Sequence, residues 1–162
     1  MAMYGIQDIE ATDDGDIVLD DLGDIKIANP LRTMGQIVNW TILTNRGELV
    51  TDPSFGANLQ QFYGERNTEA TRNFMEKNII TELVERQIVT NTDLEVDVVA
   101  LTPHEAAVFV SIDGEFIDTD DESQFAFLDA DGTLDMAFEY PFTSGTIVPV
   151  SISGLTLTVD NV

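Results

Sequence analysis

The chain has 162 residues and a mass of 17.8 kDa, and its 43% apolar content is enough for one domain with a sizeable core. It has no cysteine and one histidine, His104, which excludes disulfide scaffolds, cysteine-ligated metals, thiol nucleophiles and sites that need two imidazoles. Thirty acidic residues against seven basic ones give a net charge of −23, so we expect no nucleic-acid partner and no docking on anionic membranes.

The charge is unevenly distributed along the chain. Residues 1–25 contain eight acidic and no basic residues, residues 26–86 contain seven of each sign, and residues 87–162 contain fifteen acidic and no basic residues. An anionic surface of this kind repels itself, and about 1 M salt removes the repulsion by shortening the Debye length to about 3 Å. The composition is therefore typical either of a soluble protein with a self-repelling surface or of a protein that works in high salt.

The N-terminal part predicts an extended arm followed by a helix. Residues 6–27 alternate apolar and polar side chains around two turn signals, and we find no internal repeat in the chain. Asn29 suits a helix N-cap and Pro30 suits the first helical position. The apolar residues that follow recur on one helical face, so we expect this helix to end near Thr44.

The middle of the chain predicts a short junction and a longer helix. Residues 48–56 indicate an extended piece and 57–62 a brief helical turn. The long helix should cover about 68–88, with Asn67 or Thr68 as its cap.

Two rows of apolar residues at period 3.6 define the face that this long helix should bury. We expect Phe74, Ile80 and Val84 to lie on it. The i,i+4 pairs Arg72–Glu76 and Glu82–Arg86 should lie on the solvent face.

After residue 89 the pattern changes to period two. Residues 94–101 and 106–112 predict two strands, joined by a turn that contains His104. An acidic loop and two further predicted hairpins follow, over 113–124, 125–140 and 147–159. The element order predicts an α+β fold in which two helices pack on a small antiparallel sheet. We divide the chain into an N-terminal arm, a core domain and an acidic all-β extension, at 1–28, 29–112 and 113–162.

Several motifs invite a chemical interpretation. Asp129 and Asp131 lie in a strand–Asp-x-Asp-Gly-Thr sequence that resembles the first motif of haloacid-dehalogenase-type phosphatases. That chemistry also needs a downstream lysine, and no lysine or arginine follows residue 86, so a hairpin turn is the better interpretation. The same acidic stretch, with residues 118–122, leaves a Ca²⁺-binding β module as an alternative function, although it lacks the EF-hand register.

Glu48 and Asp52 are close enough in sequence to suggest a glycosidase pair. With thirty acidic residues such proximity is expected by chance, and no aromatic sugar platform accompanies it. A lysozyme-like glycosidase is therefore the least favoured alternative. We predict no catalytic residue, no metal site and no cofactor, and we find neither a secretory signal nor an apolar run long enough to span a membrane.

The junction also carries a longer signature. A helix runs into Ile-Leu-Thr-Asn-Arg-Gly-Glu at 42–48, followed by Thr-Asp-Pro-Ser-Phe-Gly-Ala-Asn-Leu at 51–59, a second helix and two strands. This order resembles the sheath-initiator family of contractile tails, the small baseplate wedge subunits once labelled lysozyme-like, from contractile phages, tailocins and injection systems. The resemblance covers about residues 13–112. Members often carry an acidic-Pro-Arg triplet at the end of the second helix, whereas this chain has Glu85-Arg86 without proline, and residues 113–162 extend beyond the usual domain.

The resemblance implies a non-enzymatic subunit of a virion or injection-system baseplate, assembled in the host cytoplasm. Its implied partners are the tail sheath protein and baseplate wedge proteins, with the tail tube as a further candidate, and about six copies would surround the tail axis. The subunit would template the first sheath ring, because a sheath arm would add a strand to an exposed edge of the 94–112 sheet. The resemblance assigns packing and interface roles to its signature residues, Thr44, Gly47, Glu48, Asp52, Pro53, Phe55, Gly56, Leu59 and Arg86.

Overall fold

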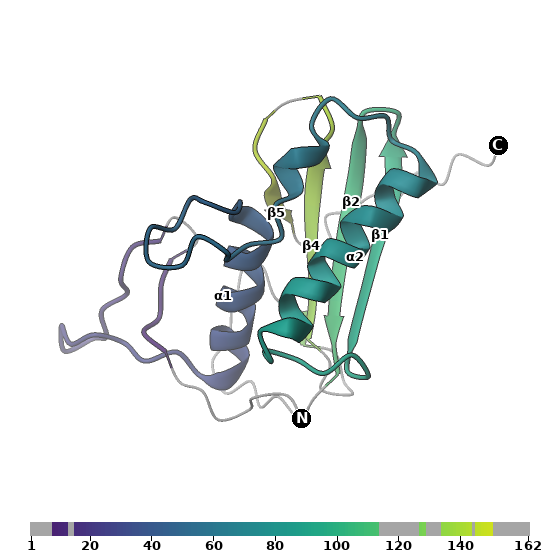
Figure 1. The fold of residues 1–162 in the computed structure, drawn as a ribbon. Coiled ribbons are helices and arrows are strands. Elements are labelled where there is room, and N and C mark those ends of the chain that lie inside the picture. The colour runs from purple at the N-terminus through teal and green to yellow at the C-terminus, as the bar shows by residue number, and fades with distance from the viewer. Residues whose placement is uncertain (1–7, 13–14, 114–126, 129–133, 144, 151–162) are drawn as a thin grey trace.

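The computed structural model describes residues 8–12, 15–113, 127–128, 134–143 and 145–150. Within these ranges two helices pack against an antiparallel sheet, which confirms the α+β prediction (Figure 1). The acidic loop after residue 113, the Asp-Gly turn at 129–132 and the strand expected at 155–159 lie outside the described residues.

Both helices begin at the predicted caps. Helix α1 spans Pro30–Leu43, and the side chain of Asn29 accepts a hydrogen bond from the backbone N–H of Arg32 at 2.7 Å. Helix α2 spans Glu69–Glu85 and is capped in the same way by Thr68. Between them lies the short 3-10 helix η1, Leu59–Phe62, where the sequence predicts a brief helical turn.

The sheet is four strands wide. Strands β1 (Leu94–Thr102), β2 (Glu105–Ile112) and β4 (Leu134–Pro141) lie side by side, and the short strands β3 (Phe127–Leu128) and β5 (Val148–Val150) share the outer edge of β4. All neighbours are antiparallel, and β4 pairs with β2 along its whole length. Strand β2 is therefore central, with strand β4 on the side away from β1, and among the described residues the 94–112 sheet keeps an edge without a neighbouring strand only at β1.

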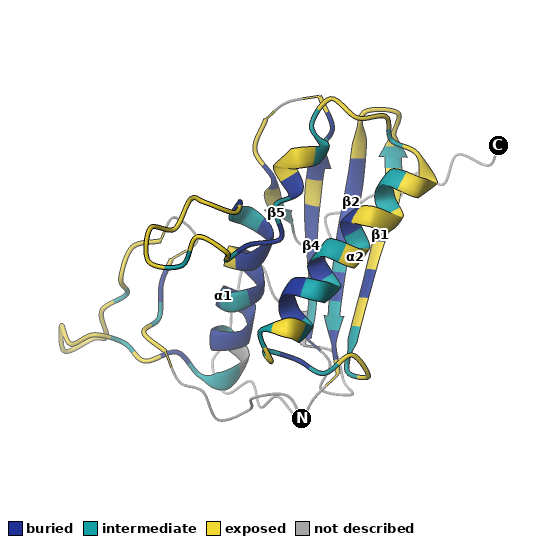
Figure 2. Ribbon diagram, viewed as in Figure 1, coloured by how far each residue is buried: buried dark blue, intermediate teal, exposed yellow. Residues whose placement is uncertain are grey.

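The core lies between the helices and one face of the sheet. Alternate strand residues such as Val108, Phe138 and Tyr140 are fully buried on this face, opposite Met75 and Leu83 of α2. Figure 2 shows buried positions along β2 and β4, with α2 in front of the sheet and α1 beside it. Burial of this apolar surface, at about 25 cal/mol per Å², is the main stabilising contribution to the fold.

Helix α2 is rotated relative to the predicted phase. Met75, Ile79 and Leu83 are fully buried, whereas Phe74 is 61% exposed. Ile80 and Val84 are half-buried beside the core. The prediction that Phe74 is buried is therefore wrong, because the helix presents the neighbouring apolar row to the sheet.

The predicted ion pair between Arg72 and Glu76 does not form. Arg72 donates instead to the side chain of Asn67 at 2.7 Å. Glu76 accepts from the backbone N–H of Val98 in β1 at 2.9 Å. Both side chains therefore tie α2 to its surroundings rather than to each other.

The N-terminal arm contains a repeat that the sequence prediction missed. Three segments eight residues apart, 9–11, 17–19 and 25–27, meet in antiparallel bridges. Their central residues form a closed ring of hydrogen bonds, in which Val18 donates to Glu10, Lys26 to Val18 and Glu10 to Lys26, each at 2.9 Å. Gly15 and Gly23 adopt φ of 89° and 85° at equivalent positions of the two connecting turns. The repeat is visible in the sequence as Ile-x-x-x-Asp-x-Gly-Asp at 9–16 and 17–24.

Candidate assembly site

The signature residues meet at one junction between the two helices. Eight of them lie between the end of α1 and the start of η1, and Arg86 is the C-cap of α2. Thr44 is the C-cap of α1, and the N–H of Gly47 donates to the carbonyl of Pro53 at 2.8 Å, which closes the exposed loop between them. Gly47 adopts φ of 90°, as expected for the glycine after a helix end.

Arg86 is the centre of a polar cluster at this junction. Its guanidinium donates to Asp52 at 2.7 Å and to the hydroxyl of Ser54 at 3.0 Å, and its Cζ lies 5.0 Å from the centroid of the Phe55 ring. Hydrogen bonds to Asp52 and Glu82 raise the pKa of Arg86 above its usual range, and the bond from Arg86 lowers the pKa of Asp52. Both groups are therefore charged at neutral pH, and the cluster joins α2 to the loop.

Glu82 is a buried member of the cluster that sequence reasoning placed wrongly on the solvent face. The residue is 4% exposed, accepts from Nε of Arg86 and from the N–H of Gly56 at 3.0 Å, and lies 3.7 Å from Arg46. The Glu82–Arg86 pair itself is confirmed. Glu82 lies three residues after Ile79 on the buried row of α2, and this spacing is the signal that could have revealed its burial.

Gly56 allows the closest approach in the junction. Its φ is 113°, and a Cβ added there would lie 2.2 Å from the carbonyl oxygen of Thr44. The next residue, Ala57, donates to the carbonyl of Thr41 at 2.9 Å, and Leu59 is fully buried one turn later. The end of α1 and the start of η1 are thus in direct backbone contact, which only glycine at position 56 permits.

Glu48 and Asp52 have different partners. Glu48 accepts from the backbone N–H of Asn45 at 2.7 Å and from its Nδ2 at 3.1 Å, and these bonds lower the pKa of Glu48. The pKa of Asp52 is lowered as well. A glycosidase needs one carboxyl whose raised pKa keeps it protonated, and neither residue has this property.

The described residues contain no group of three or more His, Asp or Glu side chains that could hold a metal ion. Asp129, Asp131 and residues 118–122, which suggest the phosphatase-like motif and the Ca²⁺ alternative, lie outside that part of the chain. His104 is exposed in the turn between β1 and β2, as predicted. None of the helices in the described ranges is long and apolar enough to cross a membrane.

Strand β1 forms an edge of the sheet. Because the N–H of Val98 bonds to Glu76, the backbone groups of even-numbered β1 residues point away from β2. Among the described residues no strand pairs with this side of β1. Val96 and Val98 are buried beneath α2, while Glu95 and Asp97 are exposed on the opposite face.

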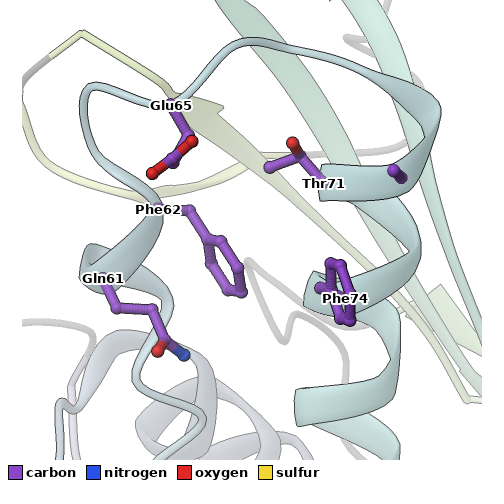
Figure 3. Close-up of a pocket in the computed structure, with 6 residues that line it drawn as sticks. Gln61, Phe62, Glu65, Thr71 and Phe74 are labelled. Carbon is purple, nitrogen blue, oxygen red and sulfur yellow. The ribbon is translucent and has the colours of Figure 1, made fainter.

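An open groove lies between η1 and the first turns of α2 (Figure 3). Its volume is about 360 Å³, and it is lined by Gln61, Phe62, Glu65, Ala70, Thr71 and Phe74. The exposed ring of Phe74, which the sequence predicts in the core, forms one wall.

Comparison with known proteins assigns the chain to no family: no protein-family model, no curated protein and no solved structure matches it.

Proposed function

We propose that this chain is a non-enzymatic structural subunit of a contractile-tail baseplate. In this role it links baseplate wedge proteins to the tail sheath and templates the first sheath ring by β-strand addition. The open outer side of β1 is the observation that carries the proposal, since a nine-residue edge strand is the surface that strand addition requires.

The junction supports a structural role for the signature residues. Arg86 forms ion pairs with Asp52 and Glu82, and Glu48 accepts a hydrogen bond from Asn45. These polar contacts stabilise the junction between the two helices. A junction of this kind fixes how α1 and α2 are placed relative to the sheet. Residues that serve assembly need this rigidity, whereas a two-carboxylate glycosidase needs carboxyls with contrasting pKa values.

The edge of β1 offers a strand-length row of backbone partners. The outward N–H groups belong to alternate residues, among them Val96 and Ala100, and the outward N–H of Val98 is bonded to Glu76. An incoming sheath strand would pair with these groups and would displace the Glu76 carboxylate. Exposed Glu95 and Asp97 protect the edge from pairing with another copy, because like charges repel.

The arm and the junction loop expose apolar surface suited to further partners. Val50 at the loop tip is 93% exposed, and Leu22 in the arm is 88% exposed. Four more aliphatic side chains of the arm are at least half exposed, namely Ile17, Leu19, Ile25 and Ile27. Exposed apolar clusters mark interaction sites, so in this proposal wedge proteins cover the arm and the loop.

A proline at Ala100 tests strand addition. Ala100 is exposed and its N–H faces outward, so proline removes a donor to the sheath strand and no bond within the sheet. Ala100→Val is the matched control, since it adds bulk and keeps the N–H. Polymerisation of the sheath protein is followed by negative-stain electron microscopy. We expect wild type and A100V to shorten its lag. A100P should leave the lag as it is for sheath protein alone, although the thermal melt of A100P remains cooperative.

Nucleation by folded A100P at the wild-type rate would reject strand addition at β1. If wild-type protein does not affect polymerisation of the sheath protein encoded with it, the baseplate role itself is rejected.

A further inference from the structure

The groove beside η1 presents two aromatic rings to solvent. Phe62 comes from η1 and Phe74 from α2, and Figure 3 shows their side chains facing one another across the opening. Phe62 is half-buried against the core, whereas Phe74 is 61% exposed and supports no part of the core. An exposed aromatic at the mouth of a groove offers a ring face on which a partner can stack.

The groove also presents a carboxylate that has no cation. Glu65 is exposed at its rim and forms no ion pair with any described lysine or arginine. Gln61 lies on the η1 side of the same opening and contributes an amide group (Figure 3). Two ring faces, one carboxylate and one amide oxygen together suit a flat cation with several N–H donors.

We propose that this groove binds an arginine side chain presented by a partner protein. The guanidinium would stack against Phe62 or Phe74 and donate to the Glu65 carboxylate, with the Gln61 amide oxygen as a further acceptor. Arginine fits better than lysine because its planar group stacks on aromatic faces and donates in parallel to a carboxylate. The cavity of about 360 Å³ accommodates one such side chain with the backbone beside it.

The junction already contains an arginine that contacts both an aromatic ring and a carboxylate. At the junction Arg86 lies 5.0 Å from the centroid of the Phe55 ring and bonds to Asp52 at 2.7 Å. The groove has the aromatic and the carboxylate of this triad and lacks the arginine. A second copy of the chain is a poor donor, since each copy carries a net charge of −23 and the copies repel.

Titration of the isotopically labelled full chain with N-acetyl-L-argininamide, followed by NMR, tests the proposal. We expect saturable shifts at the amides of Gln61, Phe62, Glu65 and Thr71, up to about 50 mM ligand, where a millimolar Kd gives near saturation. Glu65→Gln and Phe74→Ala should each weaken the affinity by about tenfold. Glu69→Gln is the matched control for Glu65→Gln, because Glu69 is an exposed carboxylate at the start of α2 and does not line the groove.

Equal shifts with the neutral citrulline analogue would overturn the proposal, as would shifts spread over the acidic surface or equal affinity in E65Q and wild type. A concentration-dependent dimer in sedimentation velocity that E65Q dissociates would show that a second copy fills the groove, which also contradicts a separate partner. The titration needs no sheath protein, so its outcome is independent of the proposed baseplate role.

Discussion

At the scale of single residues, Gly56 and Glu82 decide whether the junction can form. Gly56 lets the backbone pass the end of α1, and its N–H donates to the buried Glu82 carboxylate. Glu82 in turn holds Arg86, which binds Asp52 in the exposed loop. Two of these contacts link residues 26 and 34 positions apart, so one substitution should affect the whole junction.

Two glycine substitutions separate steric contact from backbone strain. Gly56→Ala should cost more than about 3 kcal/mol, because the new Cβ meets the Thr44 carbonyl at 2.2 Å and φ is 113°. Gly47→Ala should cost only about 1 kcal/mol, since φ is 90° but no atom lies within 4 Å of the new Cβ. Urea unfolding of both variants measures the difference, and equal losses would contradict the close approach at Gly56.

The Asp52–Arg86 contact should make stability pH-dependent. The pKa of Asp52 is lowered in the folded state, so its contribution is complete above the ordinary value of 3.8 and is lost as pH falls below it through the folded pKa. The difference in melting temperature between wild type and Asp52→Asn should therefore be constant near neutral pH and shrink towards zero under acid conditions. A difference that stays constant to low pH would mean that the ion pair does not stabilise the fold.

At the scale of elements, α2 shows what the sequence can and cannot predict. Its caps and extent follow from Thr68 and the period of its apolar residues, which are local signals. Its rotation depends on which of two adjacent apolar rows meets the sheet, and the sequence of the helix does not distinguish them. The sequence of the helix also does not reveal that Glu82 is buried, because its partners Gly56 and Arg46 come from a distant segment.

The sheet shows the same limit of local patterns. Period-two alternation predicts β1 and β2 and the hairpin between them. The pairing of β4 with β2 joins segments separated by more than twenty residues. Alternation within a strand does not identify the strand that pairs with it. The signature residues can be recognised in the sequence because they lie close together along the chain. The groove cannot, because it forms only when the rotation of α2 exposes Phe74.

Truncation of neighbouring residues tests the observed phase of α2. Met75→Ala should destabilise the chain by about 2–5 kcal/mol, since Met75 is fully buried. Phe74→Ala should change stability by less than about 0.5 kcal/mol, because the ring is 61% exposed. Chemical denaturation of both variants checks the order, and the reverse order would place Phe74 in the core.

At the scale of the whole molecule, charge should govern stability. The net charge is −23, and the acidic arm contains one described ion pair, between Lys26 and Glu10 at 3.1 Å. We expect the melting temperature to rise between about 0.1 M and about 2 M KCl, because salt screens the repulsion between acidic side chains. An unchanged or lower melting temperature at high salt would contradict adaptation to high salt. Sulfate salts are unsuitable for this test, because sulfate also strengthens apolar burial.

A rigid junction, an open sheet edge and exposed apolar surface occur together in this chain. The junction orients the sheet, β1 offers its outer side, and the arm and loop present aliphatic side chains. Each feature suits a protein that is completed by its neighbours. The proposed function requires that a sheath strand completes β1.

Electron microscopy of the intact particle, at a resolution that traces the backbone, tests this claim most directly. We expect the chain to lie between the tail tube and the first sheath ring, with a sheath strand paired along Leu94–Thr102 and Glu76 displaced from Val98. Absence of the chain from the particle, or a sheath contact that leaves β1 unpaired and Glu76 in place, would contradict it.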